Sequence, residues 1–394
     1  MKEGVNVKSQ DFYMEQTDSS LVKSLIVSNY FDTWLNIVYG YTNKNFVIYV
    51  DLYCGPGEYE NSKKSTPALI MDKLNSKEAL MKKAKNKLLF WFNDSNPILT
   101  KKLTECLQTY GLENIKFDKP SVPCNPMTVF ITNYELPSVE IETLIRRLDF
   151  PILAFLDPWG YKGISKELID MIVNKPYSDC IFFFNYNRIR PAIENENVIE
   201  HVQKILGSEG LKNVKERLMM ATTQYQKEII ILDEIIKYFS NNYRRYVVPF
   251  RFLTYTTQKQ RTSHYIIFVT KNSTAQKVMK EIMSKLCSDT HELHFSYIPP
   301  NPQLSFLGID QSDESKEKIK KRLLQTYAGK ELSFKELYAK EGYYNVYTVD
   351  QYFDILKDLE IEGKVVFSLP PTKKGNDRKL SADNLYKMGK VKFV

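Results

Sequence analysis

A short loop of this sequence combines a carboxylate with two glycines, a composition found where a chain turns closely around a ligand. The loop reads Asp51-Leu-Tyr-Cys-Gly-Pro-Gly57. Glycine relaxes the steric limits on a turn and lets main-chain atoms approach a ligand. The run before it, residues 45–51, is apolar, β-branched and aromatic, as in a strand buried on both faces of a sheet. A strand, a glycine turn and a helix beginning near Thr66 predict a cofactor loop, although a tight turn without a ligand has the same local pattern.

Two further polar residues follow neighbouring strand-like runs. Asp94 ends residues 88–94, and Asn133 follows residues 128–132. The carboxyl ends of parallel strands share one edge of a sheet, so both side chains are expected near the Asp51 loop. There Asp94 can accept hydrogen bonds from both hydroxyls of a ribose, and the Asn133 carbonyl can accept one from an adenine amino group. The alternative for Asp94 is structural, because Asn-Asp-Ser-Asn-Pro also forms a good turn and helix cap.

The stretch Phe155-Leu-Asp-Pro-Trp-Gly-Tyr161 supplies the candidate catalytic residues. It resembles the DPPY-like motif of amino-methyltransferases and, more closely, the Asp-Pro-Phe-Gly of tRNA guanine dimethyltransferases. In such a site the Asp157 carboxylate and the Pro158 carbonyl accept hydrogen bonds from an amine, and positioning does most of the catalytic work. Trp159 or Tyr161 could stack on a base that has left its helix. In the alternative, Asp157 and Pro158 only cap the next helix and Trp159 packs in the core.

Strand-like and helical runs alternate along most of the chain. Beyond the runs already named there are two strands (151–158 and 180–187), a helical segment (188–245) and a late strand pair (247–256 and 264–270). Such alternation predicts βαβ units and an α/β doubly wound sheet. The number and order of the runs suit the Rossmann-like seven-stranded sheet of class I methyltransferases, whose last strand is antiparallel. We expect one domain over residues 1–305, with the helical segment inserted over the ligand edge of the sheet.

A proline-rich connection beginning at Pro299 precedes a second unit, expected over residues 312–394. Three short helical runs, a strand and a polar turn predict a winged helix-turn-helix. The third helical run, residues 348–360, carries four acids against one lysine, so phosphate would repel it. Basic residues follow Gly363, among them Lys364, Lys373, Lys374, Arg378 and Lys379. Nucleic acid would therefore meet the wing and tail, while the alternative is a protein-docking module with a solvated basic edge.

The composition is that of a well-cored protein with a basic surface. Of the 394 residues 43% are hydrophobic, and the formal net charge of +8 mildly favours anionic partners. The five cysteines form no Cys-x-x-Cys pair, so neither a zinc site nor a disulfide framework is predicted and no metal is expected. Residues 1–18 are too polar for a secretory signal, and no apolar run approaches about 18 residues. These features predict a cytoplasmic protein without a membrane span.

Several motifs together resemble the three-Cys-motif partner (TcmP) family. They are VDLYCGPGEYE with Thr66-Pro67, FWFND, FLDPWGYKGI, FFFNYNRI and SHYIIFVT, within residues 17–285. The resemblance implies a class I methyltransferase fold, S-adenosylmethionine as cofactor, and a genomic partner that is a radical-SAM-like protein bearing three cysteines. It also directs attention to Asn185, Asn187 and Arg188 as residues bordering a substrate pocket, although turn residues would look the same. Tyr53-Cys54 stands where relatives often have Phe-Ala, a change that leaves the loop intact.

The predicted function combines these motifs. Asp51, Tyr53, Gly55, Gly57, Asp94 and Asn133 form the expected cofactor-binding set. Asp157 to Tyr161 are expected to hold the acceptor, so the leading hypothesis is a S-adenosylmethionine-dependent methyltransferase that N-methylates a base amine in RNA or DNA. The alternative is a non-catalytic nucleic-acid-binding or complex-forming subunit that acts with the radical-SAM-like partner, in phage defence or a mobile element.

Overall fold

A computed structural model describes most of the chain. The described residues are 17–41, 46–60, 63–77, 87–112, 114–117, 120, 127–158, 160, 163–255, 260–299, 312–372 and 376–394. Four of the residues singled out above, Trp159, Tyr161, Lys373 and Lys374, lie outside these ranges. Within them, no helix is both long and apolar enough to cross a membrane.

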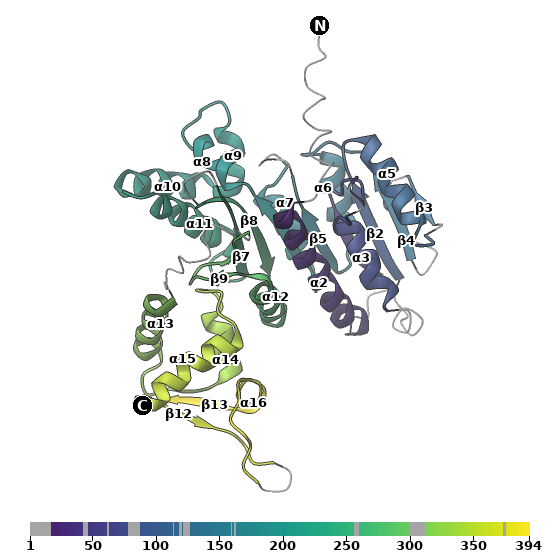
Figure 1. Ribbon diagram of the computed structural model, residues 1–394. Coiled ribbons are helices and arrows are strands. Elements are labelled where there is room, and N and C mark those ends of the chain that lie inside the picture. The colour runs from purple at the N-terminus through teal and green to yellow at the C-terminus, as the bar shows by residue number, and fades with distance from the viewer. Residues whose placement is uncertain are drawn as a thin grey trace.

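The larger part of the molecule is built on one ten-stranded sheet, seen at the centre and right of Figure 1. Its strand order is β3-β4-β2-β1-β5-β6-β8-β7-β10-β9. The strands are β1 (Phe46–Asp51), β2 (Lys87–Asn93), β3 (Ile115–Lys116), β4 (Met127–Thr132), β5 (Ile152–Leu156), β6 (Asp179–Phe184), β7 (Tyr246–Tyr255), β8 (Gln260–Thr270), β9 (Asp289–Thr290) and β10 (Phe295–Tyr297).

The expected methyltransferase-type sheet is confirmed at the centre of this order. β4, β2, β1, β5 and β6 are parallel neighbours, and β8 inserts antiparallel between β6 and β7. The two-residue β3 extends one edge, and the short β9 and β10 extend the other. These three strands were not predicted from the sequence, because runs of two or three residues carry no measurable alternation.

Two layers of helices cover the sheet. Strand β1 is buried throughout, with Val47 and Tyr49 in one core and Ile48 and Val50 in the other, because successive strand residues point to opposite faces. One face is covered by α2 (Asp18–Tyr41), α3 (Thr66–Asn75), α5 (Pro97–Gln108) and α12 (Ser273–Leu286); the other by α6 (Val139–Arg147), α7 (Lys166–Val173), α8 (Tyr186–Ala192), α9 (Ile199–Leu206), α10 (Ser208–Met220) and α11 (Gln224–Ser240).

The C-terminal part has its own hydrophobic core and the predicted winged-helix elements. Its helices are α13 (Ser312–Tyr327), α14 (Phe334–Glu341), α15 (Val349–Ile361) and α16 (Ala382–Met388), and its sheet has the order β11 (Glu331–Ser333), β13 (Lys390–Phe393), β12 (Val365–Ser368). The helix α16, between β12 and β13, was not predicted. Ser381 caps it by accepting a hydrogen bond from the Asn384 N–H.

The winged helix docks on the sheet domain through the turn between α14 and α15. The Tyr343 ring stacks on Tyr246 with the ring centroids 4.2 Å apart. The Gln276 side chain donates to the Gly342 carbonyl at 2.8 Å, and Val346 is buried in the core of the sheet domain. Tyr246 is the first residue of β7, which runs parallel to β1, so the docking lies at the amino-terminal edge of the parallel strands (Figure 1).

Candidate functional site

The site forms where β1 and β5 end side by side. The two strands are parallel neighbours, with Asp51 opposite Phe155, so the glycine loop after β1 and the Asp157 segment after β5 meet at one edge of the sheet. Between them lies a first cavity of about 600 Å³. Its lining includes the carboxylates of Asp51, Asp94 and Asp157. The predicted juxtaposition of the two loops is therefore present, and a hollow separates them.

Asp51 is the most deeply buried of the three carboxylates, with 1% of its surface exposed. The N–H of Tyr53 donates to Asp51 Oδ1 at 3.1 Å. Burial, together with the charges of Asp157 and Asp94, raises the pKa of Asp51 well above its usual range, although the Tyr53 bond and Lys23 act in the opposite direction. An acid held in this way gains most from a cationic partner.

Asp94 has the structural role that was the alternative on sequence grounds, while its predicted contact with a ribose stays a prediction. Its carboxylate accepts hydrogen bonds from the N–H groups of Gly55, at 3.2 Å, and Asn96, at 2.9 Å. Asn96 in turn caps α5 by accepting from the Ile98 N–H. Asp94 thus fixes the start of α5 and the glycine loop, and it also borders the first cavity, where burial raises its pKa.

The two loop glycines have different surroundings. Both have left-handed φ angles, 64° at Gly55 and 83° at Gly57, which side chains rarely adopt. Gly55 lines the first cavity, whereas Gly57 does not. A Cβ at Gly57 would lie 3.0 Å from the Leu103 side chain and 3.1 Å from Cys106. Gly57 therefore allows the loop to pack closely on α5.

Asp157 is already paired in this structure. Its carboxylate forms an ion pair with Lys23 of α2, and the side chains are 19% and 14% exposed, respectively. The Lys23 ammonium also lies 5.4 Å from the centre of the Phe183 ring. Behind it, His264 stacks on Phe252, and burial, with the nearby Lys23, lowers the pKa of His264 to about 3. Phe183 and His264 thus give the cavity an aromatic, neutral wall, and its charge is carried by the three acids, Lys23 and Arg188.

A second cavity, of about 580 Å³, adjoins the first. Tyr53, Ser95, Pro158 and Arg188 line both. Of the three predicted substrate residues, Asn185 lines the first cavity, Asn187 the second and Arg188 both. Asn185 also caps α8 by accepting from the Arg188 N–H at 3.2 Å, so that helix starts at the junction of the cavities.

Asn133 lies beside the site without lining any of these cavities. Its side chain donates to the Asp94 carbonyl at 2.7 Å and to the Thr100 hydroxyl at 2.9 Å. These bonds tie the end of β4 to the start of α5. The predicted contact between the Asn133 carbonyl and an adenine stays a prediction.

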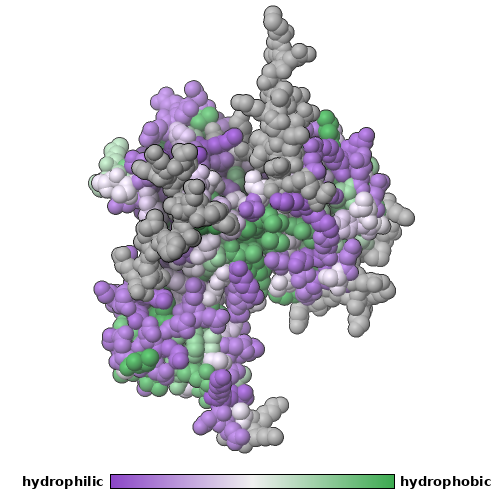
Figure 2. Space-filling view, viewed as in Figure 1, coloured by the Kyte–Doolittle hydropathy of each residue, from purple (hydrophilic) through white to green (hydrophobic). Residues whose placement is uncertain are grey.

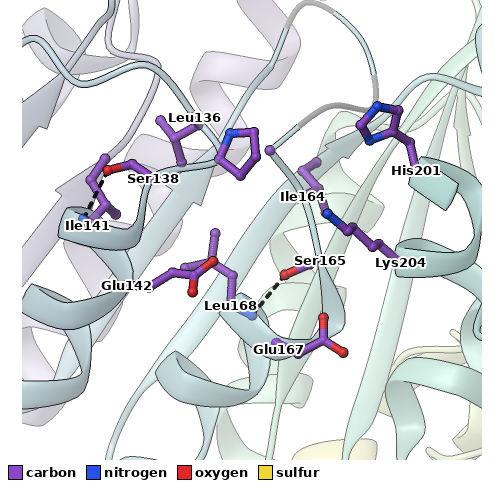
Figure 3. A pocket seen from close by; sticks show the side chains of 12 residues that line it. Leu136, Ser138, Ile141, Glu142, Ile164, Ser165, Glu167, Leu168, His201 and Lys204 are labelled. Atoms are coloured by element: carbon purple, nitrogen blue, oxygen red, sulfur yellow. Dashed lines mark hydrogen bonds between the residues drawn. The ribbon is translucent and has the colours of Figure 1, made fainter. Parts of the chain in front are cut away.

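A third, smaller cavity of about 260 Å³ is not lined by Asp51, Asp94 or Asp157 and lies between the first turns of α6 and α7 and the helix α9. Figure 3 shows Ser138 and Ser165 at its walls, each accepting a hydrogen bond from the backbone of its own helix. The hydroxyls that could bind a ligand are therefore used as helix caps. We assign no function to it.

The sequence analysis missed the contribution of α2. Ser20, Lys23 and Ser24 of this helix line the first cavity. Lys23 and Ser24 follow Ser20 by three and four residues, which places the three side chains on one side of the helix. A polar stripe on a helix otherwise rich in apolar residues was the available signal. Phe183 and His264 were missed because they come from strands that pair only in three dimensions.

Comparisons with known proteins give a partial match. Residues 297–372 match the GMT-like wHTH domain family, and no curated protein matches the chain. The likeness to the TcmP family therefore stays a prediction.

Several solved structures are similar at low scores. A Listeria monocytogenes protein described as a class I S-adenosylmethionine-dependent methyltransferase is 11% identical, over 68% of this chain and 63% of its own, with a TM-score of 0.32. Protein LPL1258 of Legionella pneumophila is 11% identical, over 66% of this chain and 91% of its own, with a TM-score of 0.32. Loganic acid methyltransferase with SAH is 9% identical, over 59% and 77%, with a TM-score of 0.27. The fold assignment rests on the strand order described above.

Proposed function

We propose that this chain is a S-adenosylmethionine-dependent methyltransferase that N-methylates a base amine in nucleic acid. The observation that carries the proposal is the first cavity, where three carboxylates converge between the ends of β1 and β5 of a methyltransferase-type sheet. The residues fit the cofactor. Asp51 is a buried acid suited to an ammonium group, and Asp94 is an acceptor suited to ribose hydroxyls. When bound, the cofactor supplies an activated methyl group on a sulfonium.

The acceptor side of the proposed reaction uses Asp157 and Pro158. An Asp157 oxygen and the Pro158 carbonyl would accept hydrogen bonds from the two N–H groups of the amine, which orients the nitrogen lone pair. The nitrogen would gain the methyl group as the C–S bond of the cofactor breaks, and it would lose one proton, which the Asp157 carboxylate would accept. The second cavity, lined by the polar side chains of Glu135, Asn187 and Asn195, offers a place for the remainder of a base.

Nucleic acid as the acceptor is supported by the winged helix and by charge. The amino end of α15, which enters the groove in most helix-turn-helix proteins, is covered here, since Thr348 and Val349 are buried. The exposed side of α15 carries Asp350 and Asp354. We therefore assign the contact to the wing and tail, where the described residues between β12 and α16 form a largely hydrophilic projection in Figure 2.

The basic residues of the wing and tail are mostly exposed. Lys364, Lys387 and Lys390 pair with Glu362, Asp383 and Glu331, respectively, at 2.7–2.8 Å. Exposed pairs of this kind contribute little to stability because water screens them, so a phosphate can replace the acid at little cost.

The test combines binding with product analysis. Purified protein is titrated with S-adenosylhomocysteine in a calorimeter, and bulk tRNA and DNA incubated with S-adenosylmethionine are digested for nucleoside mass spectrometry. We expect a methylated nucleoside with the wild type and with Asp72→Ala, a control whose exposed Lys64 pair lies outside the cavity lining. Asp157→Ala should bind the cofactor product and form no methylated nucleoside. Full activity of Asp157→Ala would remove this residue from the mechanism.

The pairing of Asp157 with Lys23 favours a second candidate, a complex-forming subunit that binds no acceptor. By the family resemblance its partner would be the radical-SAM-like three-Cys protein. Cofactor binding without any methylated nucleoside, together with co-purification of that partner, would support this role. A methylated nucleoside that depends on Asp157 would exclude it.

A further inference from the structure

Lys23 is a cation that helix α2 places inside the first cavity. Its ammonium pairs with Asp157 and lies over the Phe183 ring, and its side chain is 14% exposed. Two hydroxyls of the same helix, from Ser20 and Ser24, share the wall with it. Ser24 accepts a hydrogen bond from the Thr66 hydroxyl at 3.0 Å, which ties this stripe of α2 to the start of α3. Lys23 is thus held in a fixed wall of the cavity.

The charges around Lys23 keep it protonated. Burial alone would lower its pKa, but Asp157, Tyr59 and Asp51 outweigh burial, and the pKa of Lys23 lies above its usual value. A permanently charged ammonium can neither accept a proton nor act as a nucleophile. Its remaining chemistry is to bind an anion.

The cavity lining contains three carboxylates and two cations, Lys23 and Arg188. Arg188 stands at the junction with the second cavity and lines both, whereas Lys23 lines the first cavity only. Lys23 and Asp51 both line the first cavity, and each of the two charges affects the pKa of the other. An α-amino acid group carries an ammonium and a carboxylate on the same carbon atom. A site that binds it therefore needs an acidic and a basic side chain at neighbouring positions. Asp51 and Lys23 are such a pair.

We propose that Lys23 binds the carboxylate of the amino-acid end of the methyl donor, and that this exchange releases Asp157 for the acceptor amine. The inference rests on the proposed function. In the structure described here one ion pair, Lys23 with Asp157, occupies this part of the cavity. With the donor bound, the ammonium of the donor would pair with Asp51 and its carboxylate with Lys23. Asp157 would then be free to accept hydrogen bonds, so donor binding would precede productive acceptor binding.

The experiment compares two adenosine sulfides that differ in the amino-acid group. S-adenosylhomocysteine carries the carboxylate and the ammonium, whereas 5′-methylthioadenosine has neither. Both are titrated by calorimetry into the wild type and into Lys23→Met and Lys23→Arg. We expect Lys23→Met to weaken S-adenosylhomocysteine binding by roughly 10- to 100-fold, the effect of losing a charged hydrogen bond. It should leave 5′-methylthioadenosine unchanged, and Lys23→Arg should restore much of the affinity.

A matched control is Lys166→Met. Lys166 also pairs with an aspartate, Asp170, at 2.6 Å, and lies 5.5 Å from the ring centre of Tyr238, but it lines none of the three cavities. It should leave the affinity of both sulfides unchanged.

Three results would overturn the assignment. An equal loss for both sulfides would mean that Lys23 only supports the cavity wall. Unchanged or tighter binding of S-adenosylhomocysteine to Lys23→Met would mean that the lysine obstructs the cavity. Absence of binding of either sulfide to the wild type would refute the proposed cofactor, and with it the role of Lys23; that failure differs from the first two, in which the wild type binds.

Discussion

Two clusters of charged side chains lie on the same sheet and differ in the balance between acids and bases. At β7 and β8, Glu228 of α11 is 5% exposed and accepts two hydrogen bonds from Arg251, at 2.8 and 2.9 Å, and others from Thr262 and Tyr265. None of the three cavities borders Glu228. At the ends of β1 and β5, three acids face two cations across an open cavity. A cluster whose charges are all paired within the protein stabilises the fold. An excess of one charge around a cavity favours the binding of a ligand of opposite charge.

The largest effect is expected at the balanced cluster. Glu228→Ala would leave the Arg251 guanidinium buried and unpaired, so it should lower the free energy of unfolding by about 3–5 kcal/mol. Urea denaturation followed by circular dichroism measures this. Glu216→Ala is the control, because Glu216 pairs with Lys212 at an exposed position and should change stability by less than about 1 kcal/mol. If Glu228→Ala changed the free energy of unfolding only slightly, the proposed difference between the two clusters would be wrong.

At the open cluster we expect a loss of affinity with a gain of stability. Burial raises the pKa of Asp51 in the folded protein, so ionising this acid costs stability, and the cost appears as the pH rises through the raised pKa. Asp51→Asn removes the charge. It should raise the free energy of unfolding above pH 7 and weaken S-adenosylhomocysteine binding roughly 10- to 100-fold. Denaturation and calorimetry at pH 7.5 test both, and a variant that is less stable and binds normally would contradict the assignment.

At His264 we expect an effect of intermediate size on the pH dependence of stability. The pKa of His264 is lowered to about 3 in the folded protein, while about 6.5 is normal when unfolded. The unfolded chain therefore takes up the proton first, and stability falls as the pH decreases from 6.5 towards 3. His264→Phe keeps a ring between Phe183 and Phe252 and should remove roughly 1–2 kcal/mol of the loss between pH 6.5 and 5. Identical pH profiles of unfolding for both proteins would count against a buried, neutral His264.

The smallest effect is expected where the charges are exposed. Replacing both Lys390 and Lys392 with Gln should lower the salt dependence of nucleic-acid binding by about one to two phosphate contacts and weaken binding a few-fold. Fluorescence anisotropy at several salt concentrations measures this. The companion variant Asp354→Asn, on the exposed side of α15, should change nothing. Tighter binding by Asp354→Asn would show that α15 itself approaches the phosphates.

The sequence predicted the long buried strands of the sheet well. The strand expected at 45–51 lies at Phe46–Asp51, and that expected at 180–187 ends at Phe184. Such runs are readable because burial on both faces demands continuous apolar residues. The approach of Asp51 to Asp157 also follows from strand order, since parallel strands place their carboxyl ends at one edge.

What the sequence could not predict depends on contacts between distant segments. Lys23 lies 134 positions before Asp157, and no local pattern indicates their pairing. Gly57 looked like a ligand-contacting residue, but its neighbours Leu103 and Cys106 are brought to it by the packing of α5. Val346 is likewise buried by docking between two separately cored parts, which no periodicity records.

The docking turn has a practical consequence at Gly342. A methyl group there would lie 2.2 Å from Gln276 Nε2, whose hydrogen bond to the Gly342 carbonyl fills a fully buried position. Displacing the Gln276 amide would break its hydrogen bond to the Gly342 carbonyl, between the sheet domain and the winged helix. Gly342→Ala should therefore weaken the docking of the winged helix on the sheet domain, at the contact that also buries Val346, so this variant can show how far chemistry at the strand ends depends on the attached winged helix.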